Sequence, residues 1–163
     1  MIALWRAIST VGATVNQESL RLGTEDTRHD FALFFNIMIS KRDLVIITNN
    51  PLVYEKLKDK YEIQFFDGSY LDVLLKVRDL VYKNHKLLTH PLSGSIKPKE
   101  TKYKSIAIEK KETALDNESC ALISNAIEVY KKFNVLEFPD SMLFDFQLVD
   151  LSLIASGLGI EVI

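Results

Sequence analysis

The sequence Leu44-Val45-Ile46-Ile47-Thr48-Asn49-Asn50-Pro51 joins an apolar run to a polar turn. Four consecutive apolar residues, three of them β-branched, are typical of a strand that is buried on both faces. Asn50 can cap a helix, and Pro51 suits the first helical position because its missing N–H would have no partner there. This stretch therefore predicts a buried strand followed by a helix that extends to about Lys60.

Strands and helices continue to alternate as far as the C-terminus. The pattern predicts further strands over 62–66, 86–89, 103–109, 135–138 and 160–163, and further helices over 70–84, 117–133 and 139–157. Ser69 and Asp72 have the spacing of a capping box. The last helix is so apolar that we expect it to be largely buried. The alternation predicts a single α/β domain over 43–163, three-layered and Rossmann-like, with a mostly parallel sheet.

Residues 1–42 differ in composition from the rest of the chain. They contain four arginines and one lysine, whereas 43–163 contains fourteen lysines and one arginine. One hypothesis is that 1–37 is a dispensable extension outside the α/β domain, with Met38 as an alternative start. The other is an N-terminal helix or arm that packs on the core or on a partner through its aromatic residues, Trp5, Phe31, Phe34 and Phe35.

Composition narrows the class of protein. A net charge of -2 argues against a general nucleic-acid binder, which would carry a basic excess. The single cysteine, Cys120, cannot form an internal disulfide, which favours a reducing compartment. The longest apolar run near the N-terminus, 31–39, is far shorter than the ~20 residues of a membrane span. We therefore expect a cytoplasmic protein without nucleic-acid or membrane partners.

The candidate ligand site lies in the loops that follow the predicted strands. Parallel sheets bind ligands outside the carboxyl ends of their strands, and helix N-termini there favour anions. The long loop over 91–103 is the centre of this prediction, because long loops in compact domains are often functional. The predicted ligand-binding residues are Asn49, Asn50, Asp67, Ser69, Ser93, Gly94, Ser95 and Lys97.

Each candidate also has a structural interpretation. Asn50 and Ser69 are equally typical of helix caps, and Lys97 of a solvated rim. His90 is the candidate catalytic acid or base because it follows a predicted strand, yet no carboxylate at fixed spacing marks a triad or a metal site. Asp145 and Asp150 lie on the apolar last helix. A carboxylate buried there needs a partner, and the alternative is that it faces water.

Three segments resemble one protein family. They are VIITNNPLVYEK (45–56), FFDGSYLDVLLKVRDLVYKNHKLLTHPLSGSIKPKETKYKS (65–105) and LFDFQLVDLSLIASGLG (143–159), and HPLSGSIKP (90–98) is the most specific part. The chain from about 44 to 163 resembles the GrdX family, small proteins encoded with the glycine, sarcosine and betaine reductase systems of amino-acid-fermenting anaerobes. The resemblance implies a cytoplasmic accessory role beside amino-acid reduction and carries over no catalytic residues. A lone Cys120 does not fit an electron carrier.

These observations lead to three functional hypotheses. The first is an accessory protein that binds a small anion at the strand-end loops and supports a reductase system. The second is a small enzyme that uses His90 as acid or base, with Asn49, Ser93 and Ser95 positioning an anionic substrate. The third is a purely structural partner-binding protein whose long loop meets another subunit, with a reductase-system protein as one candidate partner. The sequence identifies no cofactor or metal, and it leaves open both enzymatic activity and homo-oligomer formation.

Overall fold

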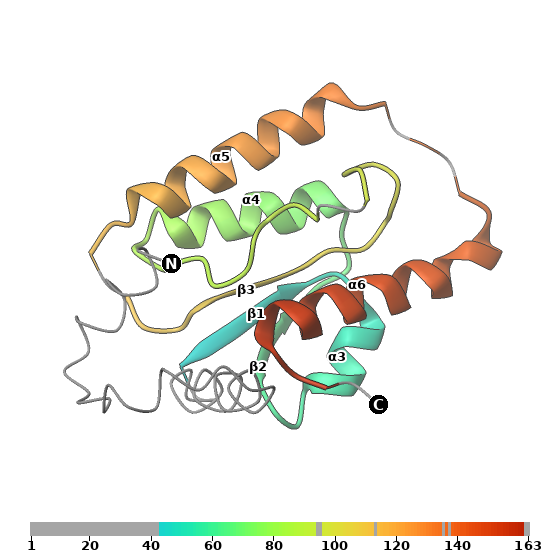
Figure 1. Ribbon diagram of the computed structural model, residues 1–163, viewed down its shortest axis with the longest axis horizontal. Helices are drawn as coiled ribbons and strands as arrows, with labels where there is room; N and C mark the ends of the chain where they lie inside the picture. Colours follow the sequence, from blue (N-terminus) through green and yellow to red (C-terminus); the bar gives the residue numbers. More distant parts are fainter. Residues whose placement is uncertain (1–42, 94–95, 113, 135, 137, 162–163) are drawn as a thin grey trace, which may run out of the picture. The chain divides into compact units, whose positions relative to one another are not determined.

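The computed structural model describes residues 43–93, 96–112, 114–134, 136 and 138–161. Its elements, in chain order, are β1 (Leu44–Thr48), α3 (Pro51–Leu57), β2 (Glu62–Phe65), α4 (Tyr70–Val81), β3 (Ser105–Glu109), α5 (Asn117–Lys132), a 3-10 helix η1 (Asp140–Met142) and α6 (Leu143–Leu158). Figure 1 shows their arrangement. The hypotheses on residues 1–37 and the domain boundary at residue 42 concern residues outside the described part. The predicted strands over 135–138 and 160–163 also lie partly outside it.

The three strands form one mixed sheet in the order β2-β1-β3. β1 is parallel to β2, with Ile46 opposite Ile63, and antiparallel to β3, with Ile46 opposite Ala107. The predicted fold, a three-layer Rossmann-like domain with a mostly parallel sheet, is therefore wrong in its sheet, because only one of the two strand pairs among the described residues is parallel.

The segment at 86–89 explains why that prediction failed. It forms no regular strand but makes an antiparallel bridge from Leu87 to Ile108, beside β3. The chain has thus already crossed the sheet to the far side of β3 before the long loop begins. The loop then reverses the direction of the chain, so that β3 begins at Ser105, opposite Thr48 at the end of β1. For β3 to run parallel to β1, a crossover connection, usually a helix, would be needed in place of this loop.

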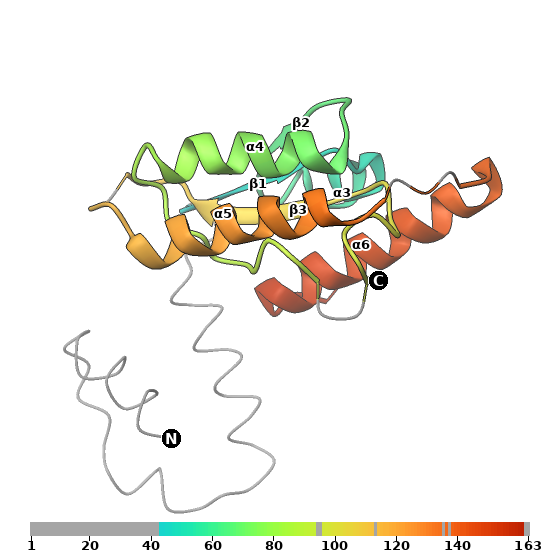
Figure 2. The same cartoon turned by 90° about the horizontal axis from the view of Figure 1, so that it is seen from above.

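Helices cover both faces of the sheet because successive side chains of β1 point in opposite directions. Val45 and Ile47 pack with α4 and α5 in one hydrophobic cluster, whereas Leu44 and Ile46 pack with α3 and α6 in another. Figure 1 shows these two helix pairs on either side of the sheet, and Figure 2 shows the same elements from above. The continuous apolar run of β1 is buried along its whole length, as its sequence predicts.

The last helix is only half buried, so the prediction that it is largely buried is wrong. Leu151, Ile154 and Leu158 in its C-terminal half belong to the core, but Phe144 remains 58% exposed and Leu148 43% exposed. Among the described residues, Asp140–Leu158 is the one stretch with the length and hydropathy of a membrane span. Core helices of soluble proteins meet the same criterion, so this composition is weak support for a membrane segment.

Candidate functional site

A buried polar cluster lies at the carboxyl end of β1. The Thr48 hydroxyl lies 2.7 Å from that of Ser105 and accepts a hydrogen bond from the Asn50 backbone N–H at 2.9 Å. Asp150 on α6 accepts hydrogen bonds from the Ser105 N–H at 2.9 Å, the Ser105 hydroxyl at 2.7 Å and Asn50 Nδ2 at 2.9 Å. All four residues are buried. The cluster thus joins α6 to the ends of β1 and β3.

The structure decides between the two interpretations of Asp150, a buried carboxylate with a partner and a carboxylate that faces water. It is only 4% exposed and has three hydrogen-bond donors around its carboxylate, whereas Asp145 is exposed. Burial raises the pKa of the Asp150 carboxyl, and this rise is opposed by the hydrogen bonds from Asn50 and Ser105 and by the charge of Lys104. Asp150 is therefore a partnered buried carboxylate.

Asn49 holds three loops together. Its Nδ2 donates to the Gly68 carbonyl at 2.8 Å and to the Lys102 carbonyl at 3.0 Å, and its Oδ1 accepts from the Lys104 N–H at 2.8 Å. The side chain is buried, and these contacts occupy both ends of its amide. Asn49 therefore positions the strand-end loops.

Asn50 and Ser69 are helix caps. Asn50 Oδ1 accepts from the Leu52 N–H at 2.9 Å. Ser69 Oγ accepts from the Asp72 N–H, and Asp72 Oδ2 accepts from the Ser69 N–H, which confirms the predicted capping box. These hydrogen bonds from the backbone and hydroxyl of Ser69 lower the pKa of Asp72. The N-termini of α3 and α4 are thus closed by side chains of the chain itself, which leaves them poorly suited to an added anion.

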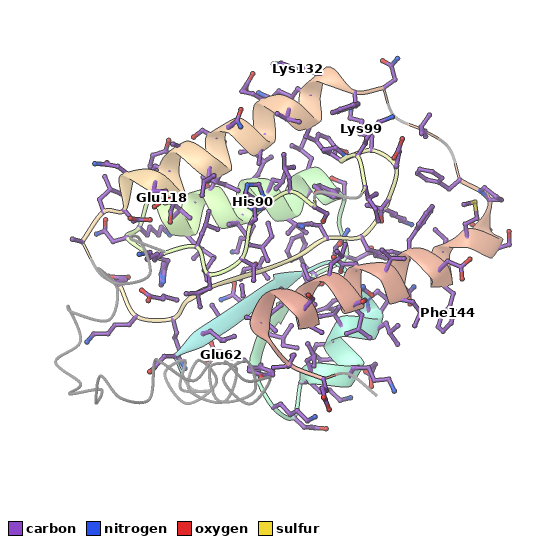
Figure 3. All side chains as sticks on the ribbon, in the orientation of Figure 1. Glu62, His90, Lys99, Glu118, Lys132 and Phe144 are labelled. Atoms are coloured by element: carbon purple, nitrogen blue, oxygen red, sulfur yellow. The ribbon has the colours of Figure 1, made fainter. Side chains whose placement is uncertain are left out.

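The predicted residues from His90 to Lys97 lie in the long loop or directly before it. Lys97 is exposed and forms an ion pair with Glu100 at 3.2 Å. His90 is also exposed, and its Nδ1 lies 2.8 Å from the Leu92 carbonyl oxygen and 3.1 Å from the Leu92 nitrogen. Figure 3 shows His90 well separated from Lys99 along this loop. Gly94 and Ser95 lie outside the described residues.

Lys104 is a functional candidate that the sequence pattern did not reveal, because the lysines at 97, 99, 102 and 104 together look like a solvated rim. It is 5% exposed. Its Nζ donates to Ser93 Oγ at 3.2 Å and lies 6.0 Å from the centre of the Tyr70 ring. Burial lowers the pKa of Lys104, an effect that the charge of Asp150 opposes. Its position directly before the apolar strand 105–108 was the available signal for burial.

A cleft of about 440 Å³ adjoins this cation through Tyr70. Its lining includes Asp67, Ser69, Tyr70, Lys99, Lys102 and Tyr130. Tyr70 and Tyr130 stack with their ring centres 5.3 Å apart, and the Lys99 ammonium lies 4.9 Å from the Tyr130 ring centre. The cleft therefore places Asp67 and Ser69 beside Lys99 and Lys102, and Asn49 donates a hydrogen bond to the carbonyl of the intervening Gly68. Residues 90, 93 and 97 do not line this cleft.

Comparison with known proteins gives one match. A family model described as GrdX-like protein matches residues 45–159, which include every element from β1 to α6 except the first residue of β1. No curated protein and no solved structure matches the chain. In the part of the chain that the structure describes, no three His, Cys, Asp or Glu side chains group as a metal site would require.

Proposed function

The chain belongs to the GrdX-like protein family, and from this premise we propose that it is a cytoplasmic accessory protein of glycine reductase-type amino-acid metabolism that binds a small anion beside Lys104. The family name supports the metabolic association. The observation that supports the anion is the buried ammonium of Lys104, which is 5% exposed and lies beside the Ser93 hydroxyl.

The contacts of Lys104 do not balance its charge. An ammonium group has three N–H donors, and Ser93 is its hydrogen-bond acceptor among the described residues. Within that same part of the chain, the ion pairs involve other lysines and Arg78, so no carboxylate contacts Lys104 directly. Burying a cation without a directly paired charge is costly, and the charge of Asp150 only partly opposes the effect of burial on Lys104. A small anion beside Nζ would supply the missing charge.

The surroundings of Lys104 suit an oxyanion. Ser93 Oγ accepts from Lys104 and retains its own O–H as a donor. An oxyanion at this place would accept from both groups, and hydrogen bonds to ionised partners are the stronger kind. Asn49 would contribute indirectly, because it accepts from the backbone N–H of Lys104 and so fixes the backbone of this residue directly before β3.

The test compares two lysine variants with the parent chain. Lys104→Met keeps the length of the side chain and removes its charge, whereas Lys97→Met removes the exposed lysine paired with Glu100. Melting temperatures are measured at low ionic strength with phosphate, sulfate and acetate. We expect an anion to stabilise the parent and Lys97→Met, by about 2.7 kcal/mol at ~100 times its dissociation constant.

Lys104→Met should lose this stabilisation. The same loss in Lys97→Met would instead move the site to the exposed end of the loop. If no anion shifts the melting of the parent at millimolar concentration, the proposed anion site is wrong. Replacing His90 with Gln should leave the shift intact, because its Nδ1 contacts lie within its own turn.

A further inference from the structure

The exposed half of α6 carries an apolar face that the proposed anion site does not use. Phe144, Leu148, Leu151 and Ala155 follow one another at spacings of four, three and four residues, which places them on one side of the helix. Phe144 and Leu148 are exposed, while Leu151 and Ala155 continue the face into the core. Large exposed apolar patches on soluble proteins mark interaction sites.

A groove lies along this face. It has a volume of about 380 Å³ and is lined by Leu148, Leu151, Ser152, Ala155, Ser156 and Ile160. Three of these residues are small, and small side chains at a helix contact allow a second helix to approach closely. The face from 144 to 155 spans about 16 Å at 1.5 Å per residue, or three helical turns. These dimensions suit a short helix.

The charges on α6 and its flanking segments indicate which kind of helix the groove suits. The sequence from Phe133 to Ile163 contains no lysine, arginine or histidine. Asp140, Asp145 and Glu161 are exposed on the same stretch. A second copy of this face would bring like charges together, which costs free energy. A partner with basic residues at its edges would meet opposite charges instead.

We propose that the α6 groove binds an amphipathic helix of another protein, with an apolar stripe about three turns long and lysine or arginine residues along its edges. Helix-in-groove recognition uses such a stripe at positions i, i+3 or i+4, and i+7. Leu148 is the central contact, because it belongs both to the exposed face and to the lining of the groove. This surface is separate from the Lys104 site, so either proposal can fail alone.

The test uses the full chain and three labelled synthetic peptides of about twelve residues, a length of roughly three turns. One peptide has a leucine stripe with lysine edges, the second has the same stripe with glutamate edges, and the third is a scramble of the first that breaks the stripe. Binding is measured by fluorescence anisotropy at several salt concentrations. We expect the first peptide to bind at least about tenfold more tightly than either of the others.

Two leucine variants show whether the groove is the binding surface. Leu148→Ser should weaken binding of the first peptide by about tenfold, since one buried anchor commonly carries that much affinity. Leu115→Ser is the matched control, because Leu115 is 50% exposed before α5, and it should change nothing. Circular dichroism checks that each variant is folded. If Leu148→Ser does not fold, Phe144→Ser takes its place.

Four outcomes would overturn the proposal. If the scrambled peptide bound as tightly as the first peptide, the binding would be explained by charge attraction alone. Unchanged binding to Leu148→Ser and Phe144→Ser would place the peptide elsewhere. Sedimentation that reveals a dimer of the chain, abolished by Leu148→Ser, would assign the groove to a second copy. Failure of the lysine-edged peptide to bind the parent chain would also reject a basic amphipathic partner.

Discussion

Asp150 accepts hydrogen bonds from both the backbone N–H and the hydroxyl of Ser105, at 2.9 and 2.7 Å, although the two residues are 45 positions apart. The contact fastens α6 to the first residue of β3. The adjacent residue, Lys104, is the buried cation of the proposed anion site. The same short segment thus connects the packing of the last helix to the candidate site.

Replacing Asp150 with Ala should strongly destabilise the protein. The change removes the buried acceptor of the Ser105 N–H, whereas the Ser105 hydroxyl keeps Thr48 and Asn50 Nδ2 keeps the Gln147 carbonyl as partners. An unsatisfied buried donor costs about 1–3 kcal/mol, and two further hydrogen bonds are lost, so we expect a loss of about 2–3 kcal/mol. The measurement is urea unfolding, with exposed Asp145→Ala as the control. A similar small effect of both substitutions would contradict this account of Asp150.

The buried Lys104 should make stability depend on pH in the alkaline range. Burial holds the pKa of Lys104 in the folded protein below its ordinary value of 10.5. Between that lowered pKa and 10.5, the unfolded chain binds more protons than the folded chain, so the free energy of unfolding rises with pH in this window.

The measurement is urea unfolding of the parent and of two variants at a series of pH values up to about 10.5. The contribution of Lys104 is the difference between the parent and Lys104→Met, and this difference should shift in favour of the parent as pH rises. Exposed Lys97→Met should follow the parent throughout. If the parent and Lys104→Met have parallel profiles, the ammonium is not desolvated as the structure indicates.

Replacing Ser69 with Ala should separate a capping role from a ligand-binding role. Ser69 Oγ accepts from the Asp72 N–H at the start of α4. Loss of an N-cap costs about 0.5–2 kcal/mol, so the melting temperature should fall. The stabilisation by anions should remain, because Ser69 acts here as a cap. Ser69→Asp, which can still cap, should recover most of the stability, and loss of the anion effect in Ser69→Ala would show direct ligand contact.

Local sequence patterns correctly predicted several elements. The apolar run of β1, the Asn50-Pro51 start of α3 and the capping box of α4 depend on interactions between residues close in the chain. The end of α6 also depends on a local preference, because Gly159 has a φ of 63°, the left-handed conformation that glycine tolerates best. These predictions succeeded because steric limits and cap hydrogen bonds act over a few residues.

The sequence was less informative about which polar residues matter. Lys97 and Lys104 look alike in the segment 97–104, which has four lysines, yet one is exposed and the other is buried beside Ser93. Asp145 and Asp150 occupy the same apolar helix, and again one is exposed and one is buried. Burial depends on which element packs against each position, and no local pattern records this.

By itself the sequence determined where β1, α3, α4 and α5 lie, because strand burial and helix capping are encoded in residues close along the chain. Only the tertiary structure decided the direction of β3, the exposure of the first half of α6 and the pairing of Asp150 with Ser105. Each of these depends on contacts between distant segments. Such contacts form only where the folded chain brings those segments together, and they determine which charges are buried and which apolar faces remain exposed.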